Sequence, residues 1–437
     1  MTSLDIRLRA ALQPWRTAPV WRVAFSGGLD STVLLHLLAQ WARHEALPPL
    51  HALHIHHGLQ TVAESWPAHC AAVCQGLDIE LDVVRVQVGS GASLEQAARQ
   101  ARYAALAEWL QVGDVLLSAQ HRDDQAETVL FRLLRGAGVR GLAGMPVNRT
   151  LGKGRLLRPL LGCSRAELQA YAQQHELSWI EDPSNQDERF RRNFLRRQIL
   201  PLLAQHWPQA SANLARSAAH LSEAQQLLDE LAEVDLATVR GCVDFAWLPL
   251  PSLSLLEISA LSDARQRNLL RHWLAPLTPM PDSDHWAGWY DLRDAHAEAM
   301  PVWRLAAGEL HRADGRLWWL SGEWLQSPVP PIGTLVETLE LPGNGCLALT
   351  GQLPAGQWRL AYRQGGESLY MAGRGRRDLK RLLNEWRVPT FVRPRLPLLF
   401  DGDELVAVAN LAQAAQLAEC GVSLQWSPPI GAQGLSW

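Results

Sequence analysis

The stretch Val23–Leu38, VAFSGGLDSTVLLHLL, places two glycines, one acid and three hydroxyl side chains between two apolar runs. Its first residues are typical of a strand, and the apolar residues after the glycines recur at helical spacing. Glycines let the backbone approach an anion closely, and the unpaired amides at the start of a helix point toward that anion. The stretch therefore predicts a phosphate site between a strand and a helix. A glycine turn with a capping serine is the simpler alternative, and it leaves the acid unexplained.

Asp30 is the unusual residue of this loop, because a carboxylate repels phosphates unless a cation lies between them. Magnesium commonly bridges a carboxylate and phosphate oxygens, so we expect Asp30 to be a metal ligand. No lysine follows the glycines, which excludes a Walker motif. The Gly-x-Gly-x-x-Gly pattern of dinucleotide folds is also missing.

The length and composition limit the class of protein. At 437 residues the chain exceeds one ordinary core, so we expect two or three domains. A hydrophobic content of 47% with 19% charged residues is typical of a folded protein. The net charge of −3 argues against a uniformly basic nucleic-acid binder, although a local basic surface remains open. No apolar run approaches the roughly 20 residues that a membrane span needs, and no signal-peptide pattern is present, so we expect a cytoplasmic protein without membrane contact.

Six cysteines are scattered along the chain, and only Cys70 and Cys74 lie close together. Three residues separate them, which fits neither a redox pair nor a usual zinc site. Positions i and i+4 share one face of a helix, so we expect two small buried residues there.

The first part of the chain alternates short β-rich runs with longer helical runs from Trp21 to about Asp182. This rhythm predicts a parallel sheet covered by helices on both faces. We therefore expect the fold class α/β, with an N-terminal Rossmann-like parallel sheet within residues 1–208.

Two further units are expected after this domain. Residues 209–322 predict a mainly helical middle domain that ends in a hairpin signal at Asp314-Gly315. Residues 323–355 are rich in Pro and Gly and predict a linker with short strands. Residues 356–437 predict a small α+β C-terminal domain.

A second polar cluster, SAQHRDDQAET, follows the fourth expected strand and should open at the same sheet edge as the glycine loop. Asp124 and Glu127 lie three residues apart and share one helix face, and His121 precedes the helix. Such a group suits holding an ammonium ion or taking a proton from it. Helix capping by Asp123 and metal binding by His121 with the acids are the alternatives. The glycines at 136, 138, 141 and 144 then mark a flexible loop, which is a candidate lid or RNA contact.

Basic residues gather between Arg374 and Arg395, where seven arginines and Lys380 face only two acids. The run RGRRDLKRLLNEWR at 374–387 predicts one amphipathic basic helix, whose outer face could bind phosphates or could simply be solvated. A second arginine run spans 189–197, and acids near it offer partners to some of its members. From the first run we select four candidates for nucleic-acid binding: Arg376, Arg377, Lys380 and Arg381.

The loop Ser-Gly-Gly-x-Asp-Ser resembles the pyrophosphate loop of the N-type ATP pyrophosphatases, the PP-loop superfamily. Members cleave ATP to AMP and pyrophosphate and adenylate an oxygen so that a nucleophile can displace it. Further stretches resemble the tRNA(Ile)-lysidine synthetase family in order and spacing: HHGL at 56–59, QARYAAL at 100–106, AQHRDDQAET at 119–128, RPLL at 158–161, residues 179–201 and residues 373–409.

This resemblance implies a PP-loop catalytic domain followed by two smaller domains that bind tRNA. It implies that ATP is used to join L-lysine to C2 of the wobble cytidine in an isoleucine tRNA with anticodon CAU. The loop Ser26, Gly27, Gly28, Leu29, Asp30 and Ser31 would hold ATP, with Asp30 on Mg²⁺. Gln60 stands where many relatives have arginine. A homodimer is left open.

The same resemblance implies a lysine and reaction site at Asp124 and Glu127, with His121 and Arg102 nearby. Lysine's amine is protonated at neutral pH and must lose a proton before it attacks, so a carboxylate is needed beside it. We expect Asp124 to take that proton.

Two other functions fit parts of the sequence. Another PP-loop enzyme, a tRNA thiolase or an amidating synthetase, would share the loop, but no suitable cysteine pair is present and the first 22 residues are too short for an amidotransferase unit. A non-catalytic tRNA-binding protein would not need Asp30, Asp124 and Glu127 together.

Overall fold

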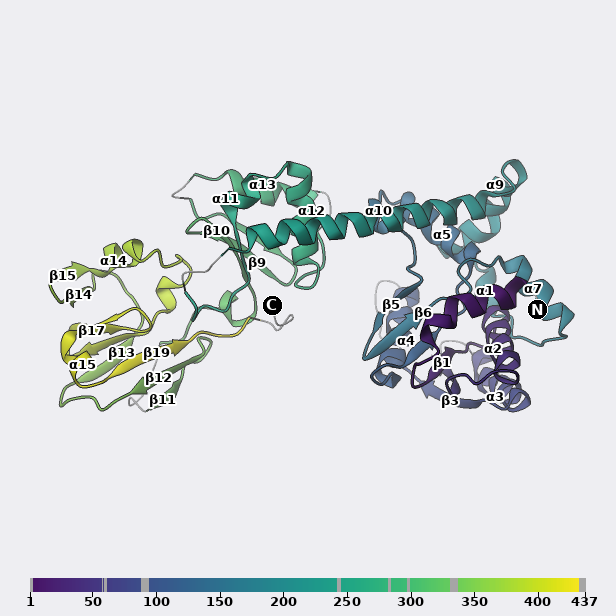
Figure 1. Cartoon of the computed structure of the whole chain (residues 1–437), viewed down its shortest axis with the longest axis horizontal. Helices are drawn as coiled ribbons and strands as arrows, with labels where there is room; N and C mark the ends of the chain where they lie inside the picture. Colours follow the sequence, from purple (N-terminus) through teal and green to yellow (C-terminus); the bar gives the residue numbers. More distant parts are fainter. Residues whose placement is uncertain are drawn as a thin grey trace. The chain divides into compact units, whose positions relative to one another are not determined.

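The computed structural model describes residues 3–56, 58, 61–87, 94–241, 245–281, 284–296, 299–330 and 337–431. It divides into two compact units, Met1–Leu227 and Leu228–Trp437, which are described separately (Figure 1). The division falls inside helix α10 (Ala210–Val239), whereas the sequence predicts a domain boundary at residue 208. Among the described residues, no helix is both long enough and apolar enough to cross a membrane.

The first unit is built on a six-stranded sheet in the order β3-β2-β1-β4-β6-β5. Five neighbouring strands run parallel, and the edge strand β5 is antiparallel to β6. The expected parallel sheet is therefore confirmed. The strands are β1 (Trp21–Ala24), β2 (Leu50–His56), β3 (Glu80–Arg85), β4 (Val115–Leu117), β5 (Asn148–Leu151) and β6 (Gly154–Leu157).

Helices cover both faces of this sheet, because alternate strand residues point to opposite faces. On β4, Val115 and Leu117 join the core formed with α1, α2, α3 and α7. Leu116 joins a separate core with Leu106 of α4. The helices are α1 (Ser3–Leu12), α2 (Leu29–Ala42), α3 (Trp66–Leu77), α4 (Leu94–Trp109), α5 (Arg122–Leu133), α6 (Val139–Leu142) and α7 (Arg165–Gln174).

Strand β1 lies between β2 and β4 and is parallel to both, so the order of winding reverses at this strand. Ligands of open α/β sheets bind at the carboxyl ends of the strands where the order reverses. Helices α2 and α5 begin just after the carboxyl ends of β1 and β4. The topology therefore brings the two polar clusters of the sequence to one edge of the sheet.

Glu167 at the start of α7 forms an ion pair with Arg7 of α1. Its carboxylate accepts a hydrogen bond from the Ser164 amide at 2.7 Å and pairs with the guanidinium of Arg7. Partial burial raises the pKa of Glu167, but the bonds from Ser164 and Arg7 outweigh it and lower the pKa to about 2. Ionised Glu167 therefore stabilises the fold above its unfolded pKa, and this contribution is lost as the pH falls toward 2.

We expect Glu167→Gln to cost about 1 kcal/mol at pH 7, because the side chain is partly exposed and its ion pair is screened. The cost should shrink as the pH falls from about 4.5, where Glu167 of the unfolded chain takes up a proton, toward about 2, where Glu167 of the folded protein does so. Hydrogen exchange of the α7 amides at pH 7 and below pH 4.5 measures this loss of stability. Glu108→Gln, on the exposed side of α4, is the control and should change neither value. Unchanged hydrogen exchange of the α7 amides in Glu167→Gln would contradict the stabilising role of Glu167.

The second unit begins with helices packed on a four-stranded sheet in the order β7-β10-β9-β8. Strands β9 and β10 form the expected hairpin, and Asp314 and Gly315 at its turn have φ angles of 48° and 68°. Both positive values suit the type I′ turn. The elements are β7 (Ser252–Ser254), α11 (Leu255–Ser259), α12 (Asp263–Leu274), α13 (Ala287–Asp294), β8 (Val302–Leu305), β9 (Gly308–Ala313) and β10 (Arg316–Leu320).

The last part of the chain forms two sheets, β11-β12-β19 and one that contains β13 to β18. Strand β12 pairs with β19 along five residue positions, so part of the segment expected as a linker belongs to the C-terminal fold. The elements are β11 (Thr338–Glu340), β12 (Cys346–Thr350), β13 (Trp358–Ala361), β14 (Ser368–Met371), β15 (Gly375–Asp378), α14 (Leu379–Glu385), β16 (Leu398–Asp401), β17 (Glu404–Val408), β18 (Ala412–Gln413), α15 (Ala415–Glu419) and β19 (Ser423–Ser427).

Candidate active site

The glycine loop joins β1 to α2. Gly28 is the N-cap of α2 and offers no side chain to the first helical amides, which remain available to an anion. The hydroxyls of Ser26 and Ser31 lie 3.0 Å apart, and the Ser31 hydroxyl also donates to the Gly28 carbonyl at 3.0 Å. These hydroxyls fix the shape of the loop, which is a role that the sequence alone did not indicate.

Gly27 is needed for a steric reason. Its φ is +80°, and a Cβ there would lie 2.6 Å from Ile180 Cδ1 and 3.0 Å from Cys70 Sγ. The Ile180 amide also donates to the Gly27 carbonyl at 2.8 Å. Gly28 differs, because the nearest atom to an added Cβ would be Ser26 Oγ at 3.5 Å.

Alanine at these two positions should therefore separate folding from binding. Gly27→Ala should destabilise the first unit by about 1–3 kcal/mol through strain and overpacking. Gly28→Ala should leave stability within about 0.5 kcal/mol but raise KM for ATP several-fold, because a methyl group hinders close approach of phosphate. Hydrogen exchange of β1 and ATP titrations measure the two effects. Equal stability of the two variants would contradict this geometry.

The second cluster sits at the start of α5. His121 is the N-cap, and its Nδ1 accepts hydrogen bonds from the amides of Asp123 and Asp124 at 3.2 and 3.4 Å. Asp124 completes a capping box by accepting from the His121 amide at 3.1 Å. Asp123, the capping residue considered from sequence, instead accepts the amide of Arg165 at the start of α7.

His121 also connects the two clusters. Its Nε2 lies 3.6 Å from Asp30 Oδ2 and 3.4 Å from Asp124 Oδ2, and the ring is buried. Burial lowers the pKa of His121, but the carboxylates of Asp30, Asp124 and Asp123 outweigh it and raise the pKa. Asp30, His121 and Asp124 are thus side by side, as expected from their place at one sheet edge.

The carboxylate of Asp30 has one unused oxygen. Oδ1 is buried and has no hydrogen-bond partner among the described residues. Burial raises the pKa of Asp30, but His121 and the charges of Arg165 and Arg196 outweigh it, and the pKa lies below its usual value. The group is therefore an ionised carboxylate with a free ligand atom.

Arg196 is the main site residue that the sequence analysis did not single out. It lies in a π-helical turn (Leu195–Ile199), and such turns are frequent at functional sites. Its Nη2 donates to Asp124 Oδ1 at 2.9 Å and to Glu127 Oε2 at 3.0 Å. The two acids expected to hold lysine are therefore bridged by this guanidinium.

Glu127 is the most deeply buried acid of the group, with only 3% of its side chain exposed. Burial raises its pKa, and the charge of Arg196 opposes this rise only in part. Arg196 belongs to the run 189–197 that was considered for phosphate binding. Arg189 of that run pairs with Asp187 at 2.7 Å, as the nearby acids predicted.

The structure shows no direct bond between Arg102 and this cluster among the described residues. Arg102 is exposed on α4, and within the described parts of the chain it makes no hydrogen bond or ion pair with His121, Asp124 or Glu127. Gln60 lies outside the described residues.

The glycine-rich loop expected to be flexible is tied to α5. Arg132 donates to the carbonyls of Gly141 and Gly144 at 2.7 and 2.8 Å. The amide side chain of Gln125 donates to the Met145 carbonyl at 3.1 Å and accepts from the Met145 amide at 2.7 Å. These bonds hold the C-terminal end of α6 and the residues that follow it to α5.

The cysteines near the site are structural. Cys70 and Cys74 are buried on α3, as predicted. Burial raises the pKa of the Cys70 thiol to about 12 and that of Cys74 to about 11, so neither is a thiolate at neutral pH.

The basic segment of the second unit is only partly the helix that was expected. Arg376 and Arg377 lie on β15, which pairs with β14, and α14 begins at Leu379 with Asp378 as its N-cap. The prediction of a single helix over 374–387 is wrong, because residues 375–378 form strand β15 and pair with β14. Leu382 and Leu383 face inward as expected. The four selected side chains, Arg376, Arg377, Lys380 and Arg381, are all exposed.

Arg395, at the end of the same segment, is buried and structural. Its guanidinium donates to the carbonyls of Gly343 and Trp324 at 2.9 and 3.1 Å. It is therefore not available to a nucleic acid.

Comparison with known proteins matches three families. The PP-loop domain family matches residues 1–203, the TilS substrate binding domain matches 253–318, and the TilS substrate C-terminal domain matches 358–426. The tRNA(Ile)-lysidine synthases of Pseudomonas fluorescens and Pseudomonas aeruginosa are 61% and 62% identical over 437 residues, covering 99% of each chain. That of Escherichia coli O157:H7 is 42% identical and covers 92% of this chain and 95% of its own. The chain therefore belongs to the tRNA(Ile)-lysidine synthase family.

Proposed function

We propose that this protein uses ATP to join L-lysine to C2 of the wobble cytidine in an isoleucine tRNA with anticodon CAU. The observation that supports it most is the meeting of the glycine loop and the acidic start of α5 at one sheet edge, with His121 between Asp30 and Asp124. A phosphate site and an amine site within reach of each other are what this ligation requires.

The first step adenylates the base. The O2 atom of cytidine attacks the α-phosphorus of ATP, the bond to the β-phosphate breaks, and pyrophosphate leaves. The phosphates are held by the backbone amides at the start of α2, which follow Gly28, and by the loop Ser26–Ser31. Leu29, buried in the core of the unit, anchors this turn.

Asp30 fits a magnesium ion. Its Oδ1 is buried without a partner, and magnesium is commonly held by one or two carboxylates together with phosphate oxygens. Within the described residues no group of three or more His, Cys, Asp or Glu side chains could hold a metal by itself. Bound there, the ion would offset phosphate charge and polarise the α-phosphate.

The second step forms the carbon–nitrogen bond. The ε-amine of lysine attacks C2, the bond from C2 to O2 breaks, and AMP leaves with that oxygen. The amine must first lose a proton, and Asp124 accepts it. Arg196 occupies the same carboxylates in this structure, so the lysine ammonium must displace it from Asp124 and Glu127 or share them with it. Arg102 is proposed to reach the reacting groups from α4.

Pyrophosphate release tests this function. Sustained release over many turnovers should require ATP, lysine and the CAU-anticodon tRNA together, because the acceptor oxygen belongs to the tRNA and only lysine displaces AMP from it. Without lysine the adenylated tRNA should accumulate and the release should stop. Equal release without lysine, or with any tRNA, would favour a different PP-loop ligase. The high pKa of Cys70 and Cys74 gives no support to a thiolase.

We expect the double change Arg377→Glu and Lys380→Glu to weaken tRNA binding about tenfold or more and to reduce its salt dependence, because both exposed cations contact phosphates. Filter binding at several salt concentrations measures it. Arg43→Glu, an exposed change in the first unit, is the control and should bind within twofold of wild type. Unchanged tRNA binding by the double variant would indicate that these cations are solvated and do not contact the tRNA.

A further inference from the structure

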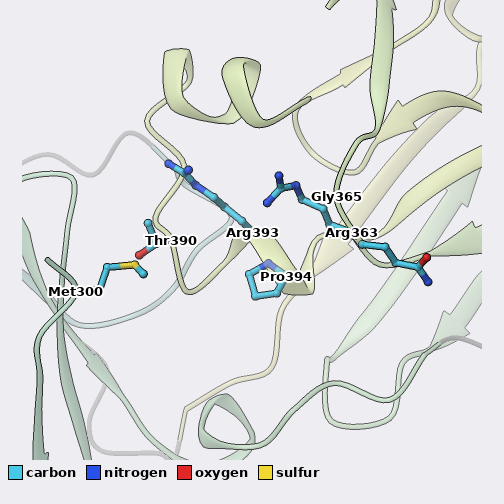
Figure 2. Close-up of a pocket in the computed structure, with 7 residues that line it drawn as sticks. Met300, Arg363, Gly365, Thr390, Arg393 and Pro394 are labelled. Carbon is cyan, nitrogen blue, oxygen red and sulfur yellow. The ribbon is translucent and has the colours of Figure 1, made fainter. Parts of the chain in front are cut away.

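A cavity of about 430 Å³ opens in the second unit between three separate segments of the chain. Figure 2 shows Arg363 and Arg393 extending from two of these segments, with Pro394 between their backbones and Met300 and Thr390 beyond Arg393. Two guanidinium groups therefore line one open cavity.

Arg363 is incompletely paired. Its Nε is buried without a hydrogen-bond partner and lies 3.6 Å from Glu367 Oε2. The other oxygen of Glu367 accepts the amides of Gln364 and Gly365 at 2.5 and 2.7 Å, which holds the loop. Glu367 thus shapes the cavity wall and offsets the charge of Arg363 only in part.

Among the described residues, the hydrogen-bond acceptors of Arg393 are neutral groups. Its Nε donates to the Val388 carbonyl at 2.8 Å, and its Nη1 donates to Asn384 Oδ1 at 2.5 Å. These bonds fix the guanidinium at the end of α14 without neutralising it. Burial and the positive charge of Arg363 lower the pKa of Arg393, and the negative charge of Asp314 opposes this only in part.

We propose that this cavity binds one phosphate of the tRNA backbone, shared by Arg363 and Arg393. A phosphate between the two guanidinium groups offsets the repulsion between them and accepts hydrogen bonds from both. An RNA backbone suits an open cavity, and α14, which carries Asn384, also presents the exposed Lys380 and Arg381. This site rests on the proposed function and adds a specific contact to it.

The test measures tRNA binding against salt concentration. The double variant Arg363→Gln and Arg393→Gln should weaken binding about tenfold and reduce the salt slope by about one, because one shared phosphate is lost. Arg393→Lys keeps the charge and should retain most of the slope. Arg304→Gln removes an exposed, ion-paired arginine of the same unit and should bind within twofold of wild type.

Three results would overturn the site. They are unchanged binding in the double variant, a slope change near two, which would mean separate phosphates, and equal weakening by Arg304→Gln. The slope is measured well below the unfolding transition, so a loss of stability does not imitate the result. Lysidine formation by the wild-type protein is assayed in parallel. Its failure would reject the proposed function, whereas normal formation with unchanged binding would reject only this cavity.

Discussion

Replacing Asp30 with alanine should reduce pyrophosphate release by at least about a thousandfold, because it removes the buried, unpartnered carboxylate oxygen that we propose as the magnesium ligand. Binding of tRNA should stay within twofold of wild type, since Asp30 belongs to the glycine loop, which we propose binds ATP and not tRNA. Turnover with saturating ATP and filter binding of tRNA measure the two quantities.

Asp30→Asn serves as the matched control for shape. It preserves the size of the side chain and removes its charge, so it should lose activity while keeping the thermal stability of the first unit. Asp30 lies close to His121 and is influenced by Arg165 and Arg196, so a structural role is the competing explanation. Loss of both tRNA binding and stability in the two variants would favour that explanation.

Replacing Arg196 with methionine should destabilise the first unit by about 3 kcal/mol, because it leaves the buried carboxylate of Glu127 without its partner. Arg189→Met is the matched control. Its ion pair with Asp187 is at the surface, with 90% of the arginine side chain exposed, so we expect a cost below about 0.5 kcal/mol.

The loss of stability caused by Arg196→Met, called the deficit below, should depend on pH. Burial already raises the pKa of Glu127, and losing Arg196 raises it further. A carboxyl with a raised pKa binds its proton more tightly in the folded state, so stability falls as the pH rises above the unfolded value. The deficit should therefore grow from pH 5 to pH 8. Hydrogen exchange of β1 and β4 measures it, and a deficit that is constant with pH would contradict the account.

The sheet and the glycine loop could be predicted because their signals are local. Strand, glycines and helix start follow one another within Val23–Leu38, and the carboxyl-edge rule then places the second cluster beside them. The proximity of Asp30, His121 and Asp124 required no knowledge of side-chain packing.

The role of Arg196 could not be predicted in the same way. Five arginines lie between residues 189 and 197, and the pairing with Glu127 spans 69 residues. Which arginine turns inward depends on the π-helical turn, which changes the helical register at Leu195. No spacing rule in the sequence identifies that turn.

The strand β15 shows a different limit. Its residues follow a helical charge pattern, yet pairing with β14 satisfies their backbone groups and takes precedence over local propensity. One signal was present, because Asp378 stands directly before the apolar run that begins at Leu379 and is a typical N-cap. Residues 346–350 belong to the segment expected as a linker with short strands. Their place in a C-terminal sheet could not be predicted, because their partner β19 lies far along the chain.

The most direct test of the whole account is the mass of the tRNA product. The CAU-anticodon tRNA would be incubated with the protein, ATP and isotopically labelled lysine, and its nucleosides would then be analysed by mass spectrometry. We predict that the wobble cytidine gains one lysine and loses one water, and that AMP forms in equal amount. An unchanged cytidine, or a base carrying sulfur or ammonia in place of lysine, would contradict the account.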